Sequence, residues 1–136
     1  KPLLRGKFLV LMADDIYAKK DIEKCLGCER AILVMKNERV GPGGRVLLGK
    51  SGKLETVAEG KFNPAGSLIS TNAFVLTPDI FSYEPVKIID REGEWGLPQT
   101  VVEMSKDYSV AVVEGNRWIK ITTPEDLKIA EQLLRK

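Results

Sequence analysis

Apolar residues gather in short unbroken runs that are separated by charged or turn-forming segments. Runs such as "FLVLMA" (residues 8–13) and "AILVM" (31–35) have strand length and no polar alternation, which is typical of strands buried on both faces. The stretch "RVLLGKSGKLETV" (45–57) predicts a hairpin that turns at residues 50–53. The expected strands are 8–13, 31–35, 45–48, 54–58, 73–76, 108–115 and 118–121.

Helical segments are marked by capping residues and by apolar residues at helical spacing. Residues 19–27 form a short amphipathic pattern that stops at a glycine, and Pro78 and Pro98 open two further candidates. The clearest helix follows Thr123, an N-cap residue, and its apolar stripe consists of Leu127, Ala130, Leu133 and Leu134. By contrast, "VGPGG" (40–44) predicts a loop.

Helices mixed with continuous apolar strands predict an α/β fold, a Rossmann-like layered domain with a mixed, mostly parallel sheet. We expect residues 1–136 to form a single domain. The side chains expected to be largely buried in the sheet are Phe8, Val10, Leu11, Ile32, Val34, Phe74, Val75 and Leu76.

Composition narrows the classes of function. The chain has no histidine, so it cannot itself build a Ser-His-Asp triad, a Cys-His pair or a histidine-ligated zinc site. Proton transfer would fall to carboxylates, lysines or tyrosines. A net charge of +2 is too mild to indicate a nucleic acid or a membrane surface as partner. The longest apolar run is too short to span a membrane, and we expect a cytoplasmic protein.

Two local patterns suggest chemistry that their context does not support. Cys25 and Cys28 form C-x-x-C at the end of a short helix, whereas a redox pair normally opens one, so we interpret them as reduced, partly buried thiols. Residues 44–51, "GRVLLGKS", match the phosphate-loop pattern G-x-x-x-x-G-K-[ST]. Their apolar centre is strand-like, however, and no helical pattern follows.

Asp14 and Asp15 follow the first apolar run directly, where that strand would reach the edge of the sheet. Ligands of α/β sheets bind beyond the carboxyl ends of the strands, and carboxylates there can hold magnesium and its phosphates. The alternative is that both aspartates only solvate a turn and cap the helix that follows.

Four segments, in this order, resemble the sugar-phosphate nucleotidyltransferases, the NDP-sugar pyrophosphorylase family. They are "FLVLMADDIY", "GKLETVAEGKFNPAGSLISTNAFVLTPDIF", "EWGLPQTVVEMSKDY" and "VVEGNRWIKITTPEDLKIAEQLL". The resemblance covers nearly the whole chain, but it corresponds only to the later part of the family's catalytic domain. The Gly-rich G-x-G-T-R-L signature that binds the nucleotide in that family is not among these residues. The resemblance therefore implies an incomplete nucleotidyltransferase fold.

The resemblance also implies roles for particular residues. Asp14 matches the family's catalytic, magnesium-binding aspartate, and Lys120 stands where the family usually has a second metal-binding aspartate. Glu59 matches the glutamate of the family's Glu-Lys sugar-site motif, with Lys61 displaced from the lysine by one position. Thr71 and Asn72 belong to "STN", which stands where Asn-Thr-Gly commonly contacts the substrate.

The implied reaction transfers a nucleotidyl group from an NTP to a sugar-1-phosphate or polyol phosphate, with Mg²⁺ neutralising the phosphates. Lys120 would either neutralise the phosphate itself or leave the site inactive, as an ion pair with Asp14. We expect the chain alone to be inactive. The competing hypothesis is a non-catalytic domain that keeps the fold and binds a phosphorylated ligand or a partner protein. An incomplete sheet exposes apolar surface, so self-association or association with another chain is expected.

Overall fold

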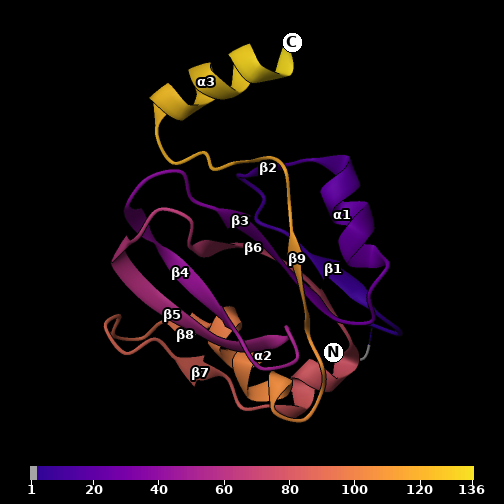
Figure 1. Ribbon diagram of the computed structural model, residues 1–136. Coiled ribbons are helices and arrows are strands. Elements are labelled where there is room, and N and C mark those ends of the chain that lie inside the picture. Colours follow the sequence, from indigo (N-terminus) through magenta and orange to yellow (C-terminus); the bar gives the residue numbers. More distant parts are fainter. Residues whose placement is uncertain (1–2) are drawn as a thin grey trace.

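The computed structural model describes residues 3–136, which form a mixed sheet with helices on both faces and a C-terminal helix that stands off the body (Figure 1). The helices are α1 (Lys19–Leu26), α2 (Leu97–Ser105) and α3 (Pro124–Leu134), with a 3-10 helix η1 at Pro78–Ser82. The strands are β1 (Phe8–Val10), β2 (Ile16–Tyr17), β3 (Ala31–Lys36), β4 (Gly41–Leu48), β5 (Leu54–Asn63), β6 (Leu68–Leu76), β7 (Val86–Lys87), β8 (Trp95–Gly96), β9 (Ala111–Glu114) and β10 (Trp118–Ile119). Within residues 3–136, every helix is too short or too polar to cross a membrane.

The strand order in the main sheet is β5-β4-β6-β3-β9, and β1 also pairs with β6. This arrangement confirms the α/β class and the mixed sheet. Parallel pairing, expected to predominate, is confined to β3 and β9, and the other pairs are antiparallel. The tight turn between β4 and β5 permits only antiparallel neighbours. Apolar runs reveal that a strand is buried on both faces, but they do not reveal its direction.

Alternate residues of β3 point into two apolar layers. Ile32 and Val34 pack with residues of α2 and η1 on one face, whereas Ala31 and Leu33 pack beside Cys25 of α1 on the other. The structure confirms burial for Ile32, Val34, Phe74, Val75 and Leu76. Phe8 and Val10 are half-buried. The prediction for Leu11 is wrong, because β1 ends at Val10 and the Leu11 side chain is 42% exposed.

The Gly-rich segment that was expected to form a loop is the first half of β4. Gly43 has a φ of +141°, and a Cβ at this position would lie 2.7 Å from the Ile69 side chain of β6. Glycine therefore permits a close approach of two strands here, which offsets its low strand propensity. β4 turns directly into β5 with no helix between them, so the hairpin is confirmed and a phosphate loop is excluded.

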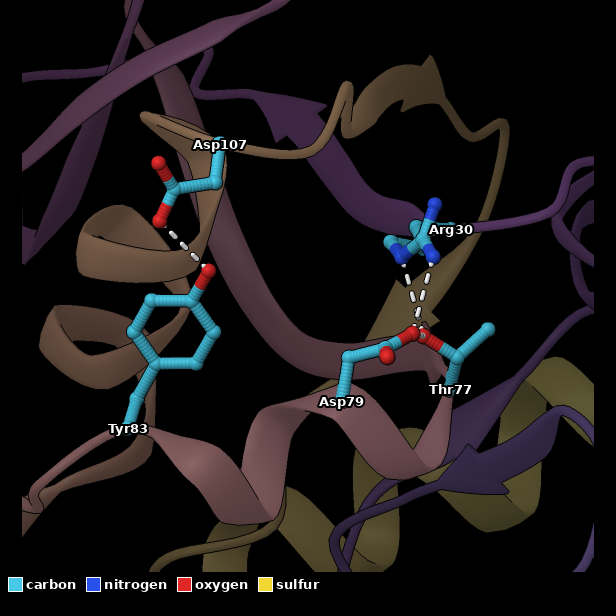
Figure 2. A network of polar contacts seen from close by, with 5 residues as sticks. All are labelled: Arg30, Thr77, Asp79, Tyr83 and Asp107. Atoms are coloured by element: carbon cyan, nitrogen blue, oxygen red, sulfur yellow. Dashed lines mark hydrogen bonds and ion pairs between the residues drawn. The ribbon is translucent and has the colours of Figure 1, made fainter.

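Polar side chains fix η1 and α2 at the end of the sheet where β3 begins (Figure 2). The Arg30 guanidinium donates to Thr77 Oγ1 at 2.9 Å and to Asp79 Oδ2 at 3.0 Å. The Tyr83 hydroxyl donates to Asp107 Oδ2 at 2.6 Å and so joins the end of η1 to the segment after α2. These contacts stabilise the end of the molecule that lies opposite the cavity described below.

The two cysteines are free, as expected, and burial raises the pKa of the Cys25 thiol to about 11. Cys25 is therefore protonated at neutral pH, and α1 presents a structural thiol rather than a reactive one.

The C-terminal helix α3 forms as predicted, but its apolar stripe faces outward. Thr123 and Asp126 make a complete capping box at its start. Leu127, Leu133 and Leu134 are 57%, 40% and 55% exposed, whereas Ala130 is buried. Figure 1 shows α3 apart from the sheet, connected by the segment that follows β10. The stripe is therefore free to pack against another polypeptide segment.

Candidate functional site

A cavity of about 980 Å³ lies where β3 ends, between the β4–β5 hairpin and the segment 88–99. Its walls come from β3, β4, β5, β6, the β7–β8 hairpin, the start of α2, and β10 with the residue that follows it. Both tryptophans of the chain, Trp95 and Trp118, are among the lining residues. Segments that are far apart in the sequence thus converge on one concave site large enough for a small-molecule ligand.

A β-bulge shapes the floor of this cavity. Leu33 pairs with Ala73 and Val34 pairs with Ser70, which leaves Thr71 and Asn72 as extra residues in β6. Asn72 has a φ of +56° and lines the cavity, and asparagine adopts this left-handed backbone more readily than most residues do.

Thr71 lies beneath the cavity and anchors the bulge. Its buried hydroxyl donates to the carbonyl oxygen of Leu33 at 2.9 Å. Its own carbonyl oxygen accepts at 2.9 Å from the hydroxyl of Tyr17, and burial raises the pKa of that tyrosine to about 12. Thr71 therefore supports Asn72 from below.

Glycine on β4 makes room for a carboxylate in the wall. Gly44 pairs with Glu59 of β5, and a Cβ on Gly44 would lie 3.1 Å from Glu59 Oε1 and 2.9 Å from Val57 Cγ1. Gln99 of α2 donates to Glu59 Oε1 at 3.4 Å. Gln99 Oε1 is itself buried and lacks a hydrogen-bond partner among residues 3–136, so this wall holds an acceptor that a ligand hydroxyl would satisfy.

Four cationic side chains line the cavity, and two of them are not paired. Lys36 Nζ lies 3.4 Å from Glu114, and Arg91 Nη1 lies 3.4 Å from Glu94. Lys61 and Lys120 take part in none of the ion pairs formed between the described residues. Two unpaired ammonium groups beside hydrogen-bonding side chains are suited to an anionic ligand such as a phosphate ester.

Two buried or half-buried carboxylates fix the segment that carries Lys120. Asp21 of α1 accepts hydrogen bonds from the backbone N–H groups of Asn116 and Arg117, at 2.7 and 3.1 Å. Asp15 Oδ2 accepts from Trp118 Nε1 at 2.9 Å, and Asp15 Oδ1 lies 3.3 Å from its backbone donor, the N–H of Ile121. Asp15 therefore holds the chain on both sides of Lys120. This structural role differs both from metal binding and from simple solvation of a turn.

The structure brings together four of the residues selected from the sequence: Glu59, Lys61, Asn72 and Lys120 all line the cavity. Thr71 lies beneath it, and its role in binding substrate stays a prediction. Asp14 is exposed in the turn before β2 and is not part of the lining.

Ser70 of the "STN" motif also lines the cavity, whereas sequence reasoning missed several other residues of the wall: Asp90, Arg91, Trp95, Gln99 and Trp118. Both tryptophans fall inside segments that carry the family resemblance, which was a usable signal. Gln99 lies in the same segment as Trp95, whereas nothing in the local sequence marks Arg91.

The magnesium implied by the resemblance would find only one of its two expected carboxylates in this chain. Asp14 lies outside the cavity lining, and both oxygens of Asp15 already accept hydrogen bonds. Lys120, at the place of the second ligand, carries an ammonium group, which cannot coordinate a cation. Within residues 3–136, no group of three or more acidic or cysteine side chains is arranged to hold a metal. Mg²⁺ is usually held by one or two carboxylates together with substrate phosphates, and of the two ligand positions that the resemblance implies, only Asp14 carries a carboxylate.

Comparison with known proteins gives both sequence and structural relatives. No protein-family model matches the chain. A bifunctional IPC transferase and DIPP synthase of Thermococcus kodakarensis is 29% identical over 139 aligned residues, which cover 98% of this chain and 30% of that protein.

The solved structures have the same fold. The inositol-1-phosphate CTP transferase of T. maritima superimposes with a TM-score of 0.67 and 18% identity over 98% of this chain and 58% of its own. For a putative glucose-1-phosphate thymidylyltransferase of Bacillus anthracis, the TM-score is 0.69 at 18% identity, over 96% of this chain and 55% of its own. The fold is that of a partial nucleotidyltransferase domain. This chain thus spans a little over half the length of the two solved chains and less than a third of the length of the curated relative.

Proposed function

We propose that this chain is the acceptor-binding part of a nucleotidyltransferase domain and that its cavity holds a phosphorylated sugar or polyol. The observation that carries the proposal is the convergence of unpaired cations with hydrogen-bonding groups in one cavity. Lys61 and Lys120 suit a phosphate, whereas Glu59, Asn72 and Gln99 suit ring hydroxyls. Both solved relatives described above are named for transfer to a ring-bearing phosphate, an inositol 1-phosphate or a glucose 1-phosphate.

In the proposed reaction an oxygen of the acceptor's phosphate attacks the α-phosphorus of an NTP. A new P–O bond forms, the bond between the α-phosphorus and the oxygen that bridges to the β-phosphate breaks, and pyrophosphate leaves with that electron pair. The cavity would contribute alignment and charge neutralisation, which is the main way in which such transfers are accelerated. The NTP would be bound by the rest of the domain, and the reaction would serve sugar-nucleotide synthesis in the cytoplasm.

A non-catalytic phospho-ligand domain is the second candidate. The observation that favours it is Lys120, an ammonium group where the family resemblance implies a metal-binding carboxylate. Both candidates predict ligand binding, but only the first predicts turnover once the rest of a nucleotidyltransferase domain is present.

The test is a fluorescence titration of the 136-residue chain with inositol 1-phosphate and, separately, with glucose 1-phosphate. Both tryptophans line the cavity, so intrinsic fluorescence reports directly on its occupation. We expect saturable binding of at least one of the two phosphates. The absence of any saturable signal with either ligand, confirmed by calorimetry, contradicts the proposal. Pyrophosphate release from an NTP by the longest natural form of the polypeptide then separates the catalytic from the non-catalytic candidate.

A further inference from the structure

The backbone at Lys120 is fixed beside the cavity. Lys120 follows β10 directly, and the β2–β10 ladder pairs Trp118 with Tyr17 and Ile119 with Ile16. Side chains alternate along a strand, so Lys120 lies on the face of Trp118, and both line the cavity. Ile119, between them, is buried.

The segment around Lys120 is held before any ligand binds. Asp15 accepts from the indole of Trp118 at 2.9 Å and, at 3.3 Å, from the N–H of Ile121, one residue after Lys120. A group that is fixed in advance loses less conformational freedom when it binds a ligand. Lys120 itself is exposed, so its ammonium group can reach a ligand in the cavity.

Lys120 makes no ion pair within the described part of the chain, although its charge is the last of several causes that lower the pKa of Asp126. No ion pair joins it to Asp14 or to any other carboxylate there. The sequence left two roles open for Lys120. One of them, a structural ion pair with Asp14, is therefore not formed. A cationic side chain that is kept unpaired at the wall of a cavity is available to an anion.

We propose that Lys120 is the built-in counter-charge for the ligand's phosphate, so that this cavity binds a phosphorylated sugar or polyol without a divalent cation. The inference rests on the proposed function and deepens it. Lys120 cannot coordinate magnesium at the position where the resemblance implies a second ligand, whereas its ammonium group donates up to three hydrogen bonds to phosphate oxygens. The positive charge that a metal ion would bring is thus supplied by the polypeptide itself.

The experiment measures the dissociation constant of inositol 1-phosphate in excess EDTA and in excess Mg²⁺, for the wild-type chain and three variants. Lys120→Met removes the charge and keeps the length of the side chain, and Lys120→Arg keeps the charge. Lys50→Met is the matched control, because Lys50 is exposed in the β4–β5 turn and outside the cavity. Each variant is also titrated with unphosphorylated inositol.

The expected result is the same dissociation constant for the wild type with EDTA and with Mg²⁺. Lys120→Met should weaken inositol 1-phosphate binding about tenfold or more, the effect of losing a hydrogen bond to a charged group. Lys120→Arg and Lys50→Met should stay close to the wild type. For unphosphorylated inositol, Lys120→Met should have no effect, because the lost partner is the phosphate.

Three outcomes are decisive against one or both proposals. If the wild type binds inositol 1-phosphate only when Mg²⁺ is present, Lys120 is not the counter-charge, although the acceptor-binding function stands. If Lys120→Met binds as tightly as the wild type, or weakens both inositols equally, the inference fails in the same way. If no sugar or polyol phosphate binds under either condition, the proposed function itself fails.

Discussion

The buried carboxylate of Asp21 joins α1 to the segment that follows β9. Its Oδ2 accepts from the backbone N–H groups of Asn116 and Arg117, at 2.7 and 3.1 Å, and its Oδ1 accepts from Asn116 Nδ2 at 3.0 Å. Asp21→Asn keeps the size of the side chain, but it removes the charge and replaces one acceptor by a donor. A hydrogen bond to a charged group contributes about 1.5 to 3 kcal/mol. We therefore expect Asp21→Asn to lower the free energy of unfolding by about 2 to 3 kcal/mol.

The same bonds predict how the effect depends on pH. Burial raises the pKa of Asp21, but the hydrogen bonds from Asn116 and Arg117 outweigh it, and the pKa lies below its usual value. The unfolded chain thus binds this proton more readily than the folded one does. The contribution of Asp21 is complete above the unfolded pKa of about 3.9 and is lost as the pH falls through the lower, folded pKa. The difference between wild type and Asp21→Asn should be constant at neutral pH and shrink in acid.

Urea unfolding followed by circular dichroism, repeated from neutral pH into acid, measures both effects. The midpoint should fall for Asp21→Asn while the slope against urea is unchanged. Asp14→Asn is the matched control, because Asp14 is exposed and makes no hydrogen bond among the described residues. A midpoint for Asp21→Asn equal to that of the wild type, or a difference that persists unchanged in acid, would refute the reasoning.

Three further changes have defined outcomes. Phe74→Ala removes a fully buried ring and should cost about 3 to 5 kcal/mol in urea unfolding, and a cost below about 1 kcal/mol would contradict the assigned core. Gly44→Val places a branched side chain against Glu59 and should weaken inositol 1-phosphate binding about tenfold in the fluorescence titration, and unchanged binding would remove Glu59 from the site. The exposed stripe of α3 should make the chain self-associate in light scattering, and Leu127→Glu with Leu133→Glu should reverse this; a wild-type monomer at all concentrations would contradict it.

The sequence predicted those elements whose stabilising contacts lie close together along the chain. Thr123 caps α3 as expected, in a capping box with Asp126, because both partners lie within one turn of the helix. The β4–β5 hairpin formed as expected because its turn brings neighbouring strands together. The Gly-rich start of β4 was missed, since the reason for glycine there is the Ile69 side chain of a different strand.

The candidate site depends on contacts that no local pattern contains. Asp15 and Trp118 meet across 103 positions of sequence, so the adjacent aspartates could suggest a ligand site without revealing that one of them holds the Lys120 segment. The direction of the strands was likewise not encoded in their apolar runs. Residue-by-residue resemblance selected Glu59, Lys61, Asn72 and Lys120, which the structure places in one cavity, because a resemblance carries long-range information that hydrophobic periodicity lacks.

The central claim, that this cavity holds a phosphorylated sugar or polyol, is tested most directly by a map of where the ligand binds. A ¹H–¹⁵N NMR titration of the 136-residue chain with inositol 1-phosphate provides it. We predict that the indole resonances of Trp95 and Trp118 and the backbone resonances of Glu59, Lys61 and Asn72 shift together and saturate at one dissociation constant. Shifts confined to residues outside the cavity, or none at saturating ligand, would contradict the claim.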